Sequence, residues 1–302
     1  MSPDVIGKSL ALICAVAWAG AVVFFKRSGE TMRPLALNLF KSTVACLAIM
    51  PLWVLIDRPM IPDTLSMKEL GYLALSGVVG ITLADTLFLT CLNTLGAGYY
   101  AIIDCVYSPM MIFFSWLLLG EPLTLVHVWG SLFVITGVMV VTTENTFKTH
   151  LGWKKIVKGS ASGIVAVGLM VISIIGVKPI LDNHSPLLVA QCRMIPAAVV
   201  LHLIALFQKN RVYIYKTITG ARAFRLALPG AVLGNVISIL AWISAFKYTD
   251  MGSASILNQT NVILVVVLAW IFLGEPLSYR KLAATLLGFI GAAIILNGCH
   301  LR

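Results

Sequence analysis

The sequence predicts an all-α integral membrane protein whose ten transmembrane helices form two inverted five-helix repeats. Two observations carry this prediction: a very apolar composition with ten runs of spanning length, and a duplicated pattern of Gly, Pro and charged residues. Hydrophobic residues make up 59% of the 302 residues and charged residues 11%, against roughly 45–50% and about 25% in soluble domains. The chain lacks the polar surface that a soluble globule needs, so composition excludes a soluble enzyme, a nucleic-acid-binding module and a disordered protein.

Apolar runs long enough to cross a bilayer occur ten times. A transmembrane helix needs about 20 predominantly apolar residues to span about 30 Å of hydrocarbon. The runs are continuous rather than alternating, which favours helices over the strands of a membrane barrel. The expected helices cover residues 7–25, 34–55, 70–92, 97–119, 126–143, 159–177, 186–207, 223–246, 252–273 and 282–298.

The two halves of the chain repeat one another in sequence. The pentapeptide Leu-Gly-Glu-Pro-Leu stands at 119–123 and again, 154 residues later, at 273–277. We therefore expect two repeats, 1–147 and 148–302, joined in a polar stretch. Because the first run has a counterpart in the second half, we expect it to be a helix rather than a cleaved signal peptide. Other matches at offset 154, or 152 early in each half, are Gly80 with Gly234, Gly98 with Gly252, Gly137 with Gly291, Lys26 with Lys178, Pro34 with Pro186, and Lys41 with Arg193.

The helix number and the loop charges predict the topology. Five helices per repeat is an odd number, so the second repeat enters the membrane from the opposite side, as in many transporters with a binding site near the midplane. Both termini then share one side, whose loops carry six Lys and Arg residues against fourteen on the other side. Since Lys and Arg are enriched in cytoplasmic loops, we predict a multi-pass protein of the cell (inner) membrane with both termini extracytoplasmic. The same loops account for the net charge of +10 without a nucleic-acid partner.

The longest loop, 208–222, is basic and contains two tyrosines. Cations near anionic lipid and tyrosines at the interface are typical of a lipid-headgroup anchor. An ordinary cytoplasmic loop has a similar composition, so both interpretations stay open.

Several motifs together resemble a known family. They are Trp18 followed by Lys26 at the end of the first run, a Pro seven residues before a cation in each half, Tyr-Ser-Pro at 107–109, and Leu-Gly-Glu-Pro-Leu ending the fourth and ninth runs. Their order and duplication resemble the EamA-type transporters of the drug/metabolite transporter superfamily over nearly the whole chain. The resemblance implies ten helices, alternating access around a central cavity, and export or exchange of small metabolites. One departure is that family members often carry a basic loop after helix two, whereas here the basic loops follow helices five and seven.

Four charged residues stand inside apolar runs: Lys41, Asp85, Asp104 and Arg193. A charge inside a membrane is costly, and such residues usually face a cavity or a partner. They either bind substrate in a cavity or form buried ion pairs, and the two cations have the further alternative of snorkelling to the interface. The carboxylates are also candidates for coupling transport to protons.

Polar and aromatic residues complete the predicted site. Asp104 aligns with Asn258, which opens the polar run Asn-Gln-Thr-Asn at 258–261. Unpartnered amides are costly in lipid, so this run is expected to face the helix bundle or a wet cavity. We expect no catalytic, metal or cofactor site. The predicted substrate-binding residues are Trp18, Lys41, Asp85, Tyr99, Asp104, Tyr107, Arg193, Trp242, Asn258 and Asn261.

The sequence contains no hydrolase, metalloprotease or nucleotide-binding motif, so transport has to run on a gradient. We predict a secondary transporter that moves a small organic metabolite, amino-acid-like or amphiphilic, by alternating access as an exporter or exchanger. The expected partners are that metabolite and the lipid bilayer. A passive facilitator and a non-transporting membrane scaffold subunit are the alternatives.

Overall fold

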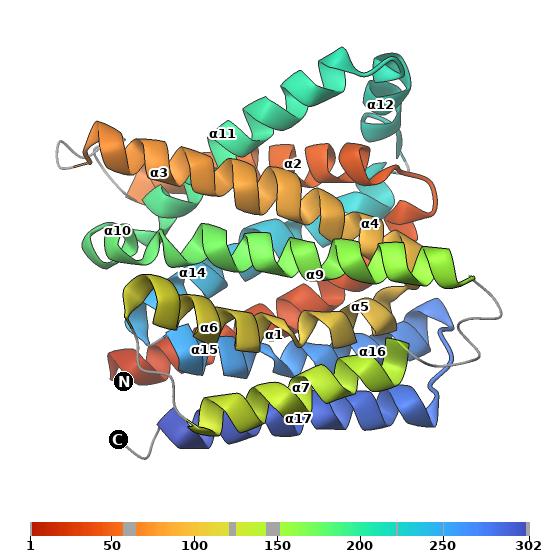
Figure 1. Cartoon of the computed structure of the whole chain (residues 1–302). Coiled ribbons are helices and arrows are strands. Elements are labelled where there is room, and N and C mark those ends of the chain that lie inside the picture. The colour runs from red at the N-terminus through yellow and green to blue at the C-terminus, as the bar shows by residue number, and fades with distance from the viewer. Residues whose placement is uncertain are drawn as a thin grey trace.

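The computed structural model describes residues 2–56, 65–120, 125–142, 152–221, 223–249 and 251–299. Every regular element in these ranges is a helix, and the long helices run side by side in a bundle (Figure 1). The predicted boundary between residues 147 and 148 lies outside the described residues.

The first half of the chain forms five helical stretches. The third is one continuous rod in which a π-helical segment, η1, joins two α-helices, and the fourth is broken after Asp104. Their bounds are α1 Pro3–Gly29, α2 Pro34–Ile56, α3 Met67–Gly77, η1 Val78–Ala84, α4 Asp85–Leu95, α5 Ala97–Asp104, α6 Tyr107–Leu119 and α7 Leu125–Thr142.

The second half repeats this order with two short additional helices, α10 and α12. Its elements are α9 Trp153–Ile175, α10 Lys178–Asn183, α11 Pro186–Phe207, α12 Arg211–Ile218, η2 Ala223–Ala227, α13 Leu228–Ala231, η3 Val232–Ser238, α14 Ile239–Tyr248, α15 Met251–Asn258, α16 Thr260–Leu273 and α17 Tyr279–Cys299.

Seven helices of the described residues are long and apolar enough to cross a membrane. They are Pro3–Gly29, Pro34–Leu55, Met67–Leu95, Ala97–Leu118, Trp153–Ile175, Pro186–Phe207 and Ala223–Tyr248. The other three expected spans correspond to α7, to α15 with α16, and to α17. The ninth run is interrupted at Gln259, which leaves Thr260–Leu273 as a shorter apolar helix.

The internal repeat extends to backbone geometry. The π-helices η1 and η3 begin at residues 78 and 232, an offset of 154, and the breaks after Asp104 and Asn258 keep the same offset. Gly120 and Gly274 end α6 and α16 in the left-handed conformation, with φ of 69° and 66°. A residue with a side chain is disfavoured there, which explains why both pentapeptides place Gly at this point.

Lysines close matching helix ends in the two repeats. Lys26 Nζ, near the end of α1, donates to the carbonyls of Leu92 and Asn93 at 3.2 Å. Lys178 Nζ, the equivalent cation, donates to the carbonyl of Phe246 at 2.7 Å. The last carbonyls of a helix have no intrahelical partner, so each lysine completes the end of a long helix.

Small residues bring the two repeats into close contact. A Cβ at Gly234 would lie 2.8 Å from the Cβ of Ala21, and one at Gly230 would lie 2.9 Å from the Cβ of Phe24. Backbones that approach this closely are typical of helix packing in membranes. Helix α1 of the first repeat is thereby packed against α13 and η3 of the second.

Candidate functional site

A cavity lies between the two repeats. Its walls come from α1, η1 and α4 to α6 in the first repeat and from α9, α11, η3 and α14 to α16 in the second. About 80 Å³ is open to the centres of water-sized molecules, and one water needs roughly 10–15 Å³ by this measure. The cavity therefore has room for several waters or for a small solute.

Eight of the ten predicted site residues line this cavity: Trp18, Asp85, Asp104, Tyr107, Arg193, Trp242, Asn258 and Asn261. The structure places Lys41 and Tyr99 elsewhere. Lys41 is fully buried behind the cavity wall. The Tyr99 ring lies 4.5 Å from Lys281 Nζ, and its neighbour Tyr100 lines the cavity instead. Successive side chains of a helix point about 100° apart, so adjacent tyrosines cannot share one wall.

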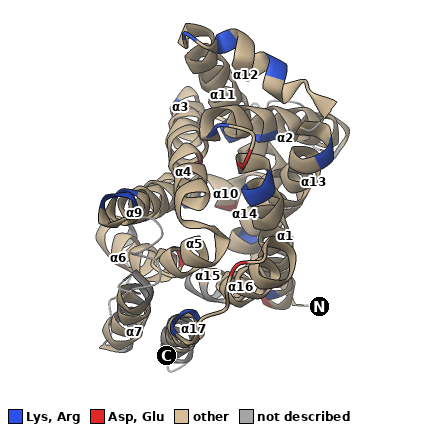
Figure 2. Ribbon diagram, turned by 90° about the vertical axis from the view of Figure 1, so that its right-hand side faces the viewer, with Lys and Arg blue, Asp and Glu red and all other residues tan. Residues whose placement is uncertain are grey.

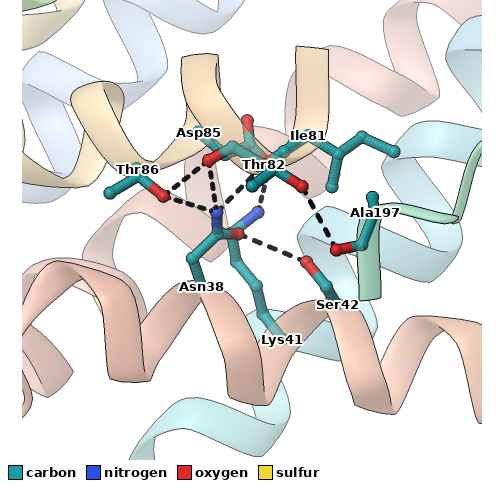
Figure 3. Close-up of polar contacts among 8 residues, drawn as sticks. All are labelled: Asn38, Lys41, Ser42, Ile81, Thr82, Asp85, Thr86 and Ala197. Atoms are coloured by element: carbon teal, nitrogen blue, oxygen red, sulfur yellow. Dashed lines mark hydrogen bonds and ion pairs between the residues drawn. The ribbon is translucent and has the colours of Figure 1, made fainter. Parts of the chain in front are cut away.

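The π-helix η1 builds the wall that carries Asp85 (Figure 3). A π-helical turn shifts the backbone hydrogen-bond pattern, and such turns are frequent at functional sites. Asn38 Nδ2 donates to the carbonyls of Ile81 at 2.9 Å and Thr82 at 3.2 Å, and to Thr86 Oγ1 at 2.9 Å. These bonds tie α2 to η1 and to the start of α4, on both sides of Asp85.

Lys41 balances the charge of Asp85. Its Nζ donates to Asp85 Oδ2 in an ion pair, and both side chains are buried. Lys41 therefore does not snorkel to the interface but pairs with the Asp85 carboxylate. Loss of one partner of a buried pair leaves an uncompensated charge, at a cost of about 3–5 kcal/mol.

Arg193 has no carboxylate partner among the described residues. Its Nη2 donates to Ser173 Oγ at 3.4 Å, and its Nε has no hydrogen-bond partner. A Cβ at Gly80 would lie 3.3 Å from Nη2 and would collide with Ser173, so glycine makes room for this contact. A buried guanidinium with a free N–H is suited to a carboxylate or phosphate, because its donors form a planar fork.

Asp104 lies in the other repeat and also has no cation within ion-pair distance in the described part of the chain. Tyr100 Oη donates to Asp104 Oδ1 at 3.0 Å, and Gln259 Nε2 donates to the Asp104 carbonyl at 3.4 Å. The free acceptor capacity of this carboxylate faces the cavity.

Unpartnered polar atoms surround the same space. The Asn258 Oδ1, the Tyr107 hydroxyl and both amide atoms of Asn235 are buried without a hydrogen-bond partner. Most buried polar groups in proteins are satisfied, and exceptions call for a water or ligand. This clustering indicates that the cavity accommodates water or a polar ligand.

Aromatic rings supply the apolar walls. Trp18 packs against Phe88 at a centroid distance of 5.4 Å, and Trp242 lies 6.3 Å from Tyr107. The site thus combines two unpaired charges of opposite sign, several free amide groups and an aromatic surface.

The ten predicted site residues leave out three polar residues that line the cavity: Tyr100, Asn235 and Ser238. Asn235 interrupts an apolar run directly after the matched Gly234, and the cost of an unpartnered amide in lipid, which pointed to Asn258, applies to it as well. Tyr100 stands four residues before Asp104 on the same helix face, and this spacing is the signal that distinguishes it from Tyr99.

A family model decides between the classes of membrane protein compatible with this geometry. The model of the EamA-like transporter family matches residues 5–143 and again residues 157–297. The chain belongs to the EamA-like transporter family. The resemblance inferred from its motifs is thereby confirmed, and each half of the chain is one EamA-like repeat. No curated protein matches the chain.

Solved structures share the fold of this EamA-like transporter. Twenty-eight chains match. One of them, titled only "Crystal structure of protein", is 17% identical with a TM-score of 0.67, and the match covers 97% of this chain and 96% of that one. At this level of identity the likeness shows the fold alone.

Proposed function

We propose that this EamA-like transporter carries a small organic metabolite with one positive and one negative group by alternating access between two inverted five-helix repeats. The observation that carries the proposal is the pair of unpaired charges in one cavity, Asp104 from the first repeat and Arg193 from the second. The expected set of ten spans then comprises the seven long apolar helices together with α7, α15 with α16, and α17.

The charge balance of the cavity favours a zwitterion. Lys41 neutralises Asp85, which leaves one negative and one positive group for the ligand. In this assignment Asp104 and the Asn258 amide oxygen accept from an ammonium group, and the Arg193 fork holds a carboxylate. Trp18 and Trp242 contact the apolar part of the substrate, since aromatic rings supply a large apolar surface. An amino-acid-like compound has all three features.

Flux measurement tests the proposal. Purified protein reconstituted into liposomes is offered a mixture of amino acids, nucleosides, sugars, monoamines and monocarboxylates, and the lumen is assayed by mass spectrometry. We expect zwitterions to enter above the level of protein-free liposomes, and other classes to enter weakly. Counterflow against preloaded substrate separates an exchanger from a passive facilitator. Uptake restricted to sugars or nucleosides would contradict the charge assignment.

Alternating access requires that one end of the cavity be closed. At one end of the structure, contacts centred on Glu275 join the two repeats. Glu275, from the second pentapeptide, accepts from the backbone N–H of Ala97 at 2.7 Å and of Gly98 at 3.0 Å. These donors begin α5 of the first repeat. Lys281 Nζ lies 3.5 Å from the same carboxylate, and Gly96 makes the approach possible with φ of 93°. The carboxylate thus caps a helix whose positive dipole end it faces.

Replacing Glu275 by Gln is expected to weaken this closure. The amide loses the negative charge and one acceptor, and hydrogen bonds to charged groups contribute about 1.5–3 kcal/mol. A loss of this size shifts the population of the open state about tenfold or more. The measurement is the reaction rate of a single cysteine in the cavity with a water-soluble reagent added at this end. Glu30→Gln removes a charge at the same end without touching α5 and serves as the control. Equal labelling rates in Glu275→Gln, Glu30→Gln and the parent would show that Glu275 does not hold this end of the cavity closed.

The distribution of cations predicts the orientation. Helix α1 begins and α17 ends at one end of the bundle (Figure 1), and Lys and Arg gather on α9, α12 and α17 at the opposite end (Figure 2). By the positive-inside rule the cation-rich end is cytoplasmic. A reporter active only in the cytoplasm and fused after Arg302 should therefore be inactive. A bright signal would reverse the orientation and leave the repeat untouched.

A further inference from the structure

Helix α12 is set apart from the other helices. It follows α11 after three residues, turns away from the direction of the long helices and runs across their ends (Figure 1). It stands at the end of the bundle where the cations gather (Figure 2). This orientation is the one expected of a helix that lies along the membrane surface.

Polar and apolar contacts fix α12 on the bundle. Ile214 is buried and packs with Leu39 of α2 and Leu201 of α11. The Tyr215 hydroxyl lies 3.0 Å from Nδ1 of His202, whose Nε2 lies 3.1 Å from Thr43 Oγ1. Since one face of α12 is anchored in this way, its remaining side chains are held in a defined orientation.

The end of α11 and the start of α12 expose apolar side chains. Phe207 is 88% exposed, Val212 75% and Tyr213 51%. A helix surrounded by water gains nothing from exposing such side chains, whereas acyl chains and the headgroup boundary accommodate them. This surface therefore fits the edge of a lipid leaflet.

Cations without acidic partners lie beside these apolar residues. Arg211 and Lys216 line a surface groove together with Leu206, Val212, Tyr215 and Thr219. No acidic residue occurs in the sequence between Asp182 and Asp250. Among the described residues neither Arg211 nor Lys216 forms an ion pair. The groove is thus positively charged and directly continuous with apolar surface.

We propose that this groove binds the headgroup of an anionic phospholipid. Arg211 and Lys216 bind the phosphate, and Phe207 and Val212 contact the acyl chains. Each Lys or Arg near an anionic membrane surface strengthens attraction by a factor of about five. Apolar surface on both sides of the cations favours a lipid over a soluble anion, which needs no apolar neighbour.

The proposal is tested with full-length protein in mild detergent, titrated with phosphatidylglycerol or phosphatidylcholine and observed by native mass spectrometry. We expect phosphatidylglycerol to bind the parent more tightly than phosphatidylcholine. The double variant Arg211→Gln/Lys216→Gln should bind phosphatidylglycerol at least tenfold more weakly. The matched control Lys154→Gln/Lys155→Gln, two exposed cations on α9 at the same end, should bind like the parent.

Two further measurements separate a lipid from a soluble anion. Val212→Ser keeps both cations and should weaken phosphatidylglycerol binding, and inorganic phosphate should not displace the lipid beyond the effect of chloride at equal ionic strength. Unchanged lipid affinity in the double variant, or equal affinity for phosphatidylcholine, would overturn the proposal. Displacement by inorganic phosphate together with full binding by Val212→Ser would also overturn it and assign the groove to a free anion.

Discussion

Replacing Asp104 by Asn is expected to lower transport at least a hundredfold while the protein still folds and reaches the membrane. Asn has nearly the same shape and can still accept from the Tyr100 hydroxyl, which lies 3.0 Å from Asp104 Oδ1. What the variant loses is the negative charge that pairs with the ammonium of the substrate. Removing one partner of a buried charge pair costs about 3–5 kcal/mol, and about 1.4 kcal/mol corresponds to a factor of ten. Flux of the zwitterion into proteoliposomes is the measurement.

Tyr100→Phe is the control for Asp104→Asn. It removes the hydrogen bond and keeps the charge, so we expect a much smaller loss. If transport is coupled to protons through Asp104, the Asn variant also loses the pH dependence of any residual flux. An Asn variant as active as the parent would place Asp104 in packing, and the ammonium would have to bind elsewhere.

Replacing Arg193 by Gln should impair transport of a zwitterion more than it impairs expression, with a loss of at least tenfold in flux. The guanidinium has no carboxylate partner in the described residues, and its Nε has no hydrogen-bond partner. Its charge is therefore available to the substrate. Arg193→Lys keeps the charge but lacks the planar fork, so we expect partial activity.

Substrate choice distinguishes binding by Arg193 from a structural role. An amine that resembles the substrate but lacks the carboxylate should be carried about equally by the parent and by Arg193→Gln. Equal losses for the zwitterion and for this amine would indicate that Arg193 supports the fold. Normal transport of the zwitterion would remove Arg193 from the site.

Much of the fold could be predicted from the sequence, because a bilayer imposes long apolar runs and duplication leaves matched residues. The offset of 154 between the two pentapeptides also relates the π-helices η1 and η3. The π-helices themselves were not predictable, since the sequence of Val78–Ala84 does not differ in kind from the other apolar segments. Seven of the ten expected spans are long apolar helices among the described residues, and the ninth run is interrupted at Gln259.

The sequence predicts the charged residues of the site well, but it predicts less well which side chains point into the cavity. A charge in an apolar run is expensive, and this rule found Asp85, Asp104 and Arg193. The same rule selected Lys41, whose side chain does not line the cavity and instead pairs with Asp85. Helices that are apolar on all sides carry no hydrophobic pattern that reveals which face meets a cavity, so only the four-residue spacing to Asp104 separates Tyr100 from Tyr99.

The central claim is alternating access through the cavity between the repeats. Labelling of a cavity residue from each side of the membrane tests this claim most directly. Ile239 lines the cavity from α14, and an otherwise cysteine-free protein with Ile239→Cys presents one thiol there. Val16, 64% exposed on the outer surface of α1, provides the matched control Val16→Cys. For active protein in sealed, oriented vesicles, we predict that a membrane-impermeant thiol reagent labels residue 239 from either side and residue 16 from neither. Labelling of residue 239 from one side only, or from neither, would contradict alternating access through this cavity.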